Sequence, residues 1–203
     1  MDVRELKVPG AWEITPKVHG DSRGIFFEWL KDSDFSSVTG HGLNVQQANC
    51  SVSSAGVLRG IHFAQVPPSQ AKYVTCVSGA VFDVVVDIRV GSPTFLQWDA
   101  VLLDDKDHRT IYVSEGLGHG FLVLQDNSTV MYLCSAEYTP QREHTILATD
   151  PALGIDWPLV DGAAPSFSDR DAAAPSFDEV RAAGLLPSWD ETQKFVADLR
   201  GHA

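Results

Sequence analysis

The chain has 203 residues, a formal net charge of −12 and a hydrophobic content of 44%, and this composition is typical of a globular protein with one sizeable core. An acidic surface repels nucleic acid and anionic membranes, so neither is expected as a partner. Cys50, Cys76 and Cys134 form neither a disulfide framework nor a zinc pattern, and the N-terminus lacks a signal-peptide core. We therefore predict a single domain over residues 1–203, located in the cytoplasm.

Short runs of alternating apolar residues recur along most of the chain, and each is typical of a β-strand. Turn-forming pairs such as Pro67-Pro68 and Ser78-Gly79 separate these runs. Many strands at short spacing predict an all-β sandwich or barrel, in particular a jelly roll. In chain order the predicted strands cover residues 11–18, 25–29, 46–52, 72–77, 81–88, 98–103, 110–113, 121–124 and 129–135.

The C-terminal part of the chain has the pattern of helices instead. Ser176 with Glu179, and Ser188 with Glu191, are capping boxes that mark helix starts. They predict helices over 177–183 and 189–200, the second ended by Gly201. We expect this helical segment, 176–203, to pack on the outside of the β-structure.

Residues 56–74 carry the strongest chemical signal, because they place His62 near Arg59 and Lys72. A histidine of near-neutral pKa can accept a proton, and a nearby cation can stabilise the negative charge that develops. Arginine also binds phosphate oxygens in pairs. The segment therefore predicts an enzyme that removes a proton beside a carbonyl of a phosphorylated substrate. The alternative for His62 is a hydrogen-bonded strand histidine.

Strand parity raises a difficulty for this interpretation. Arg59 and His62 would face opposite sides of a regular strand. A β-bulge at Gly60 would turn one of them to the other face.

A histidine base works best when a carboxylate orients it. Asp83, Asp87 and Asp171 are candidates, and the spacing alone does not choose between them. We expect Asp171 in a polar loop before the first C-terminal helix. We expect Asp83 across a β-hairpin from Lys72, where it would serve as the counter-ion of that lysine.

Inversion at a carbon also needs an acid that returns a proton to the opposite face. A tyrosine suits this role, because its phenol can donate while neutral, and Tyr132 and Tyr138 have the same strand parity. Their alternative is a pair of half-buried strand aromatics.

His119 lies between two glycines, which fits either close approach of a ligand or a turn between strands.

We expect no metal. Neither His62 nor His119 has a second histidine two residues away, as a metal site of two histidines and a carboxylate would favour. The nucleotide-binding and serine-hydrolase motifs GxGxxG, P-loop and GxSxG are absent. A metal-dependent oxygenase on a similar barrel remains an alternative.

With these residues in view, the chain resembles the dTDP-4-dehydrorhamnose 3,5-epimerase family, in the form typical of actinobacterial members. The resemblance is nearly end to end. The segments that carry it are DSRGIFFEW (21–29), QANCSVSSAGVLRGIHF (47–63), QAKYVTCVSGAVFDVVVDIRVGSPTF (70–95), YVSEGLGHGFLVLQDNSTVMYLCSAEY (112–138), DPALGIDWP (150–158) and SDRDAAAP (168–175).

The resemblance implies a cupin-like jelly roll that forms a homodimer and uses no cofactor. It implies His62 as the base, Asp171 as its carboxylate and Tyr132 as the acid. Lys72, beside Asp83, would stabilise the enolate. The implied substrate contacts are Arg23, Phe26, Glu28, Gln47, Asn49, Arg59, Lys72, His119, Glu143 and Arg170, with Tyr138 stacked on the thymine. Exchange of N-terminal strands between subunits would bring the first three of these to the neighbouring pocket.

The implied reaction inverts C3 and C5 of dTDP-4-dehydro-6-deoxy-D-glucose and gives dTDP-4-dehydro-L-rhamnose. The match over the whole chain favours this double inversion. Inversion at a single carbon and non-catalytic binding of a nucleotide sugar stay open as alternatives at this point.

Overall fold

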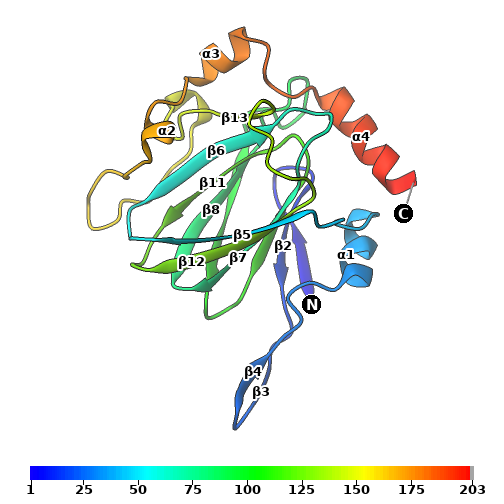
Figure 1. Cartoon of the computed structure of the whole chain (residues 1–203), viewed down its shortest axis with the longest axis vertical. Helices are drawn as coiled ribbons and strands as arrows, with labels where there is room; N and C mark the ends of the chain where they lie inside the picture. Colours follow the sequence, from blue (N-terminus) through cyan, green and yellow to red (C-terminus); the bar gives the residue numbers. More distant parts are fainter. Residues whose placement is uncertain (202–203) are drawn as a thin grey trace.

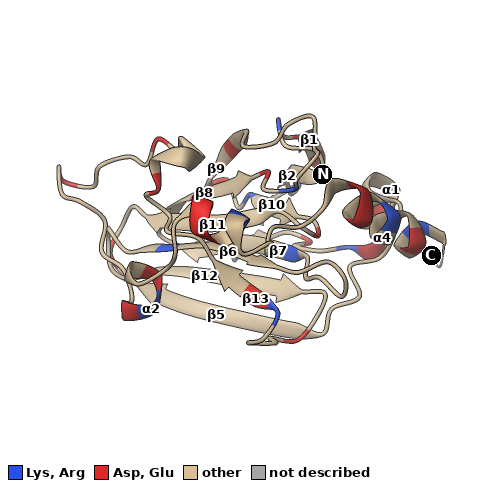
Figure 2. Cartoon of the chain, turned by 90° about the horizontal axis from the view of Figure 1, so that it is seen from above, with Lys and Arg blue, Asp and Glu red and all other residues tan. Residues whose placement is uncertain are grey.

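The computed structural model describes residues 1–201, in which two β-sheets pack face to face as a cupin-like jelly roll (Figure 1). One sheet has the strand order β1-β2-β10-β7-β12-β5 and the other has the order β13-β6-β11-β8-β9. Seen from above, the sheets form two layers, with β12 and β5 in one and β6, β11 and β8 in the other (Figure 2). The predicted all-β fold is confirmed, and it takes the form of an open sandwich.

The six-stranded sheet contains β1 (Asp2–Glu5), β2 (Ala11–Thr15), β10 (Thr110–Val113), β7 (Lys72–Ser78), β12 (Ser128–Cys134) and β5 (Gln47–Ser53). The five-stranded sheet contains β13 (Glu143–Thr145), β6 (Leu58–Ala64), β11 (Gly118–Val123), β8 (Ala80–Val86) and β9 (Trp98–Asp104). A separate hairpin is formed by β3 (His19–Asp21) and β4 (Gly24–Phe26). The helices are α1 (Asp32–Thr39), the 3₁₀ turn η1 (Pro151–Leu153), α2 (Asp169–Ala172), α3 (Phe177–Ala182) and α4 (Trp189–Gly201).

Every predicted strand overlaps an observed one, and the prediction for residues 110–113 matches β10 in full. The predicted strand over 11–18 ends early, at Thr15, because Pro16 has no amide hydrogen for the ladder. The predicted strand over 25–29 corresponds to the shorter β4. Strands β1, β3 and β13 were not predicted, and β6 was expected around Arg59 and His62 without defined bounds. Because β11 begins at Gly118, the alternative that placed His119 in a turn is wrong.

The predicted hairpin between Lys72 and Asp83 is also wrong. Strand β7 pairs with β10 and β12, whereas β8 pairs with β11 and β9. The turn at Gly79, which has a positive φ of 81°, therefore carries the chain from one sheet to the other. Lys72 and Asp83 lie on opposite layers of the sandwich.

The core lies between the sheets and on both outer faces. Inside the sandwich, an apolar cluster includes Val74 and Val130 from one sheet with Val85 and Phe121 from the other. Outside, Phe177 of α3 packs in the same cluster as residues of β6, β8 and β11, so the prediction that this helix covers the exterior is confirmed. On the opposite face, α1 covers the six-stranded sheet (Figure 1).

The predicted helices are observed close to their expected bounds, whereas α1 and α2 were not predicted. Ser176 and Glu179 form the full capping box. At α4, the Glu191 amide donates to Ser188 Oγ at 3.4 Å, which is one half of the expected box. Residues 202–203 of the predicted helical segment lie outside the described residues. Asp171 lies in α2 and not in a loop, which corrects its expected position.

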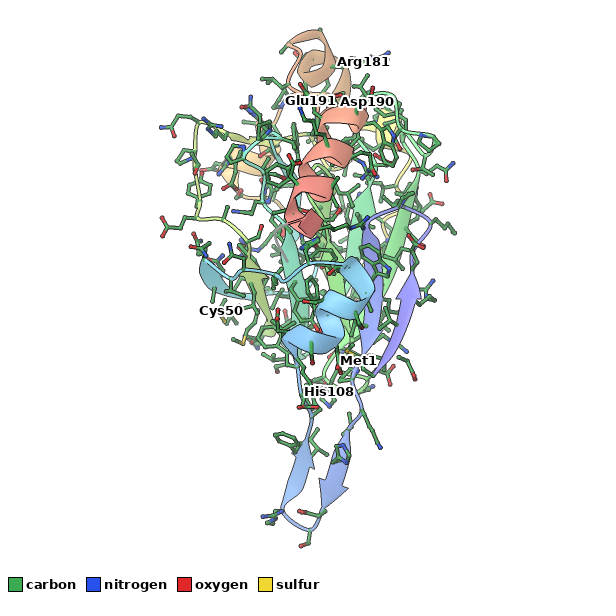
Figure 3. All side chains as sticks on the ribbon, turned by 90° about the vertical axis from the view of Figure 1, so that its right-hand side faces the viewer. Met1, Cys50, His108, Arg181, Asp190 and Glu191 are labelled. Carbon is green, nitrogen blue, oxygen red and sulfur yellow. The ribbon has the colours of Figure 1, made fainter. Side chains whose placement is uncertain are left out.

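The hairpin β3–β4 extends away from the body of the sandwich (Figure 3). Its two large apolar side chains, Ile25 and Phe26, are 58% and 67% exposed. None of the helices in the described range is long and apolar enough to cross a membrane.

A register shift in β6 decides which residues of that strand face the interior. His119 of β11 opposes His62, but Phe121 opposes Arg59, so β6 holds one extra residue between these two pairs. The extra residue turns Arg59 and His62 to the same side and leaves Ile61 in the outer apolar cluster. The predicted bulge at Gly60 is therefore confirmed.

We predict that Gly60→Ala destabilises the fold strongly. Gly60 has a φ of +122°, and a Cβ there would lie 2.6 Å from Gly120 Cα and 2.7 Å from the His119 carbonyl oxygen. Backbone strain together with these clashes should lower the free energy of unfolding by about 3 kcal/mol or more. Urea denaturation measures this loss. Gly56→Ala is the matched control, since Gly56 also has a positive φ but open space around it, and it should cost only about 1 kcal/mol. Equal losses for the two variants would contradict the prediction.

Candidate active site

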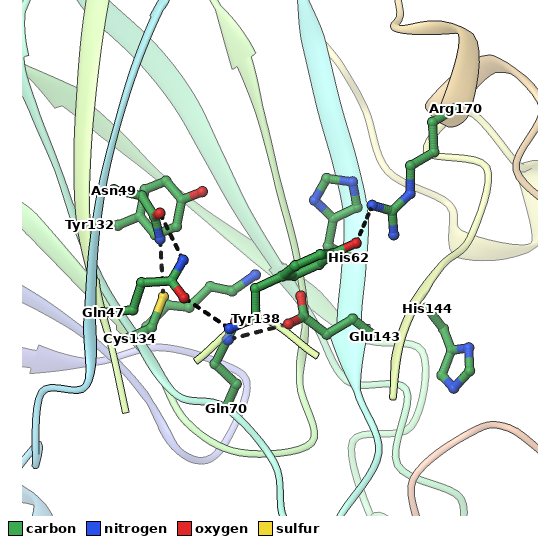
Figure 4. Close-up of a pocket in the computed structure, with 11 residues that line it drawn as sticks. Gln47, Asn49, His62, Gln70, Tyr132, Cys134, Tyr138, Glu143, His144 and Arg170 are labelled. Atoms are coloured by element: carbon green, nitrogen blue, oxygen red, sulfur yellow. Dashed lines mark hydrogen bonds between the residues drawn. The ribbon is translucent and has the colours of Figure 1, made fainter. Parts of the chain in front are cut away.

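A cavity of about 370 Å³ lies between the two sheets, beside the apolar core (Figure 4). Its walls come from both layers, from the loop after β12 and from α2. The lining residues are Gln47, Asn49, His62, Gln70, Lys72, Tyr132, Cys134, Tyr138, Glu143, His144 and Arg170. The structure thus brings most of the predicted site residues to one place.

The strand ladder explains why the side chains of one wall converge. Cys134 of β12 lies opposite Gln47 of β5 on one side and opposite Lys72 of β7 on the other. Tyr132 lies opposite Asn49 in the same ladder. Because alternate residues of a strand face the same side, all five side chains point into the sandwich.

His62 forms a hydrogen bond with Asp171, with 2.8 Å between Nε2 and Oδ1. Burial lowers the pKa of His62, and the charge of Lys72 lowers it further, while the bond to Asp171 acts to raise it. Burial acts to raise the pKa of Asp171, but its hydrogen bonds to His62 and Ser168 and nearby positive charges together lower it. An ionised Asp171 must accept, so Nε2–H donates and Nδ1 is the basic nitrogen.

The ammonium group of Lys72 lines the cavity without a direct ion pair to any residue within 1–201. Burial lowers its pKa, and the nearby Cys134, Glu143 and Asp83 oppose this shift in part. The prediction that Asp83 pairs directly with Lys72 is wrong. Asp83 is fully buried on the opposite sheet, where it forms a hydrogen bond with His119 Nε2 at 2.9 Å. Its charge acts on Lys72 only over a longer distance.

Tyr132 and His62 reach the cavity from opposite sheets. Figure 4 shows the two rings on different sides of the cavity. Burial is the main cause that raises the pKa of Tyr132, so its phenol keeps its proton at neutral pH. A basic nitrogen and a proton donor therefore face each other across the space where a ligand would lie.

Hydrogen bonds link the polar groups at the edge of the cavity. Gln47 Nε2 donates to Asn49 Oδ1 at 2.8 Å, and the Tyr138 amide donates to Gln47 Oε1 at 2.8 Å. Arg170 Nη1 donates to the Tyr138 hydroxyl at 3.0 Å (Figure 4). This last bond connects the loop after β12 to α2.

Several predicted site residues do not line the cavity of this chain. Arg59 donates to Ser53 Oγ at 2.9 Å, and its charge partly opposes the rise in the pKa of the neighbouring Tyr132. His119 is paired with Asp83 behind the cavity. Arg23 and Phe26 belong to the projecting hairpin and Glu28 follows it, away from the cavity lining.

Three lining residues were missed: Gln70, Cys134 and His144. Cys134 could have been found, because it lies two residues after Tyr132 on one strand and shares its face. Gln70 Nε2 donates to the Glu143 carboxylate at 3.4 Å. No rule of sequence spacing indicates this contact, so Gln70 could not have been found from the sequence. The His144 ring packs at a tilt beside Phe63, with 5.4 Å between the ring centroids. No group of three or more metal-ligating side chains occurs in the described part of the chain.

The site therefore has an acid and a base on opposite inner walls of a cupin-like sandwich, and this arrangement suits an isomerase that works by proton transfer. Comparison with known proteins gives the same class of enzyme. A family model described as dTDP-4-dehydrorhamnose 3,5-epimerase matches residues 5–179. The chain therefore belongs to the dTDP-4-dehydrorhamnose 3,5-epimerase family, and it is an isomerase.

The relatives are close in sequence and in structure. The dTDP-4-dehydrorhamnose 3,5-epimerase of Mycobacterium tuberculosis is 77% identical over 201 residues, which cover 99% of this chain and 100% of the relative. A solved epimerase structure from Mycobacterium tuberculosis superposes with a TM-score of 0.97 over 98% of this chain and 100% of its own. A 3'-monoepimerase from Streptomyces bikiniensis, solved with dTDP-quinovose, is 45% identical, with a TM-score of 0.92, and the match covers 96% and 98% of the two chains.

We predict that the native protein has one fast-reacting thiol. Cys50 is exposed, whereas Cys76 and Cys134 are buried, and burial raises the pKa of Cys76 to about 11. Since the thiolate is the reactive form, the buried pair should react slowly. Titration with a chromogenic disulfide should show a fast phase that Cys50→Ser removes and Cys134→Ser retains. A fast phase that persists in Cys50→Ser would contradict this assignment.

Proposed function

We propose that the chain inverts C3 and C5 of dTDP-4-dehydro-6-deoxy-D-glucose, giving dTDP-4-dehydro-L-rhamnose. The observation that carries this proposal is the placement of His62 and Tyr132 on opposite sheets, across one cavity. Inversion requires one group that removes a proton from one face of the carbon and a second group that returns a proton to the other face. Membership of the epimerase family supports the choice of substrate.

The base step follows from the geometry of the His62–Asp171 pair. The ketone at C4 acidifies the hydrogens at C3 and C5. His62 Nδ1 accepts the proton from one of these carbons. The electron pair of the C–H bond forms a double bond to C4, and the π pair of the carbonyl moves to the C4 oxygen. Asp171, bound to Nε2, stabilises the imidazolium that forms and keeps the ring oriented.

Lys72 and Tyr132 complete the cycle. The Lys72 ammonium stabilises the enolate oxygen, and this interaction is strong because the group lies in a partly desolvated cavity. Tyr132 then donates its proton to the opposite face of the carbon, and a new C–H bond forms. Exchange with solvent returns a proton to Tyr132 and removes one from His62. The same groups then act at the second carbon.

Binding of a diphosphate to an acidic chain needs local positive charge. Arg170 at the mouth of the cavity and Arg59 near Tyr132 supply it. Tyr138 would stack on the thymine, while Gln47, Asn49 and Glu143 would contact polar groups of the nucleotide. This remote binding would hold the sugar ring in register with the acid and the base.

A homodimer would complete the site. The hairpin that carries Arg23 and Phe26 projects from the sandwich with its apolar side chains exposed (Figure 3). A two-stranded hairpin is marginally stable by itself, so packing against a second copy would stabilise it. In that arrangement Arg23, Phe26 and Glu28 would reach the neighbouring cavity. His119 would help to position the substrate from behind His62.

A cytoplasmic location agrees with three free cysteines.

The central prediction concerns the two proton-transfer residues. His62→Asn and Tyr132→Phe should each lower kcat by roughly 10²–10⁴-fold, because a positioned base or acid contributes about that factor. Binding of dTDP, measured by calorimetry, should remain. In deuterated water, proton NMR should show solvent deuterium at both C3 and C5 with the wild-type enzyme.

The same NMR experiment separates the alternatives. Deuterium at one carbon alone would mean a single-site epimerase. If no deuterium enters the sugar when the enzyme is saturated with it, the proposed reaction is refuted. The remaining interpretation would then be a protein that binds a nucleotide sugar without catalysis.

The dependence of kcat/KM on pH should be bell-shaped. Burial lowers the pKa of His62 below 6.5, so activity is lost only as the pH falls below that value and the base becomes protonated. Burial also lowers the pKa of Lys72 below 10.5, so the alkaline limb should lie below that pH. Asp171→Asn removes a group that raises the pKa of His62 and should move the acid limb to lower pH while reducing kcat. A shift to higher pH would contradict this account.

A further inference from the structure

Two serine N-caps follow one another near the C-terminal end of the chain, and that of α3 is a full capping box. Ser168 begins α2 with Asp171 at the third helical position, and Ser176 begins α3 with Glu179 at the same position. In each cap the serine Oγ accepts a bond from the backbone amide of the acidic residue, at 3.1 Å from Asp171 and 3.3 Å from Glu179. In each, the serine hydroxyl also donates to the carboxylate, at 3.0 Å and 2.8 Å.

The two caps differ in what the carboxylate does. Glu179 Oε2 accepts both the Ser176 hydroxyl and the Ser176 amide, so this carboxylate serves its own helix. Asp171 divides its two oxygens. Oδ2 accepts from the Ser168 hydroxyl, and Oδ1 accepts from Nε2 of His62 on β6. The Asp171 carboxylate is buried, with a side-chain exposure of 6%.

We propose that Ser168 is a positioning residue for the epimerase reaction, and that the N-cap serine of α2 holds the carboxylate that orients the catalytic base. This inference rests on the proposed function of His62. The chain of contacts runs from the Ser168 hydroxyl to Asp171 and on to the His62 imidazole.

The physical reason is that a carboxylate can rotate about its Cβ–Cγ bond, and most orientations direct neither oxygen at His62. The Ser168 hydroxyl holds Oδ2, which leaves Oδ1 directed at Nε2. The same bond helps to keep Asp171 ionised, so it acts as an acceptor and fixes the proton on Nε2. Helix α2 has only four residues. Such a short helix has few internal hydrogen bonds with which to hold Asp171 if the cap is lost.

The matched pair of serine caps allows a capping role to be separated from a positioning role. Ser168→Ala and Ser176→Ala each remove a serine cap, so each should lower the melting temperature by roughly 2–4 °C. Only Ser168→Ala should lower kcat, by roughly 10- to 100-fold, because a catalytic group displaced by about 1 Å loses about that factor. KM should stay within about twofold. Ser168→Thr keeps the hydroxyl and should restore most of the rate.

A second measurement does not depend on turnover. Titration of the His62 ring by NMR should give a lower pKa in Ser168→Ala than in the wild-type protein, in the same direction as in Asp171→Asn. Ser176→Ala should leave it unchanged. Equal kcat and equal His62 titration in Ser168→Ala and Ser176→Ala would overturn the proposal. If the wild-type protein shows no epimerisation, the proposed reaction fails, and the His62 titration still decides whether Ser168 positions Asp171.

Discussion

The extra residue in β6 is the constraint on which the site depends. A regular strand would turn Arg59 and His62 to opposite faces, and one of them would enter the outer apolar cluster, where a charge has no partner. The bulge at Gly60 removes this conflict, since Ile61 takes the outer position and His62 faces the cavity. The close approach of Gly120 to Gly60 then fixes β11 beside β6, so His119 lies directly opposite His62. One local irregularity in a strand thereby decides the direction of the base and the place of a second imidazole.

The interior of the sandwich is divided between an apolar part and a polar part, and the division has an electrostatic cost. Removing Lys72, His62 and Asp83 from water disfavours the charged form of each group. Pairing reduces this cost for two of them, because His62 is bound to Asp171 and Asp83 is bound to His119. Among residues 1–201, the negative neighbours of Lys72 all lie beyond ion-pair distance. An unpaired ammonium at this position is available to the oxygen of a ligand, which suits the stabilisation of an enolate better than a lysine engaged in a tight ion pair.

Much of the fold could be predicted from the sequence, because strand alternation and turn pairs are local signals. Strand β10 and the Ser176 capping box are examples. The pairing of β7 with strands other than β8 could not be predicted, since the turn at Gly79 looks like a hairpin turn whichever sheet the next strand joins. The family resemblance placed His62, Tyr132 and Asp171 in the site, but their distances depend on the packing of two sheets and on α2. Ser168 was overlooked although the rule that identified Ser176 also applies to it, because Asp171 was expected in a loop.

The bond between Arg170 and Tyr138 has a consequence for the ordering of the cavity mouth. The Arg170 guanidinium uses one of its five N–H donors on the Tyr138 hydroxyl. In the proposed binding mode its other donors would serve a phosphate, and the face of the tyrosine ring would serve a base. The bond would hold both side chains in place beforehand, which would reduce the conformational entropy lost on binding. Substrate and product would carry the same nucleotide, so this pre-organisation would favour both to the same extent.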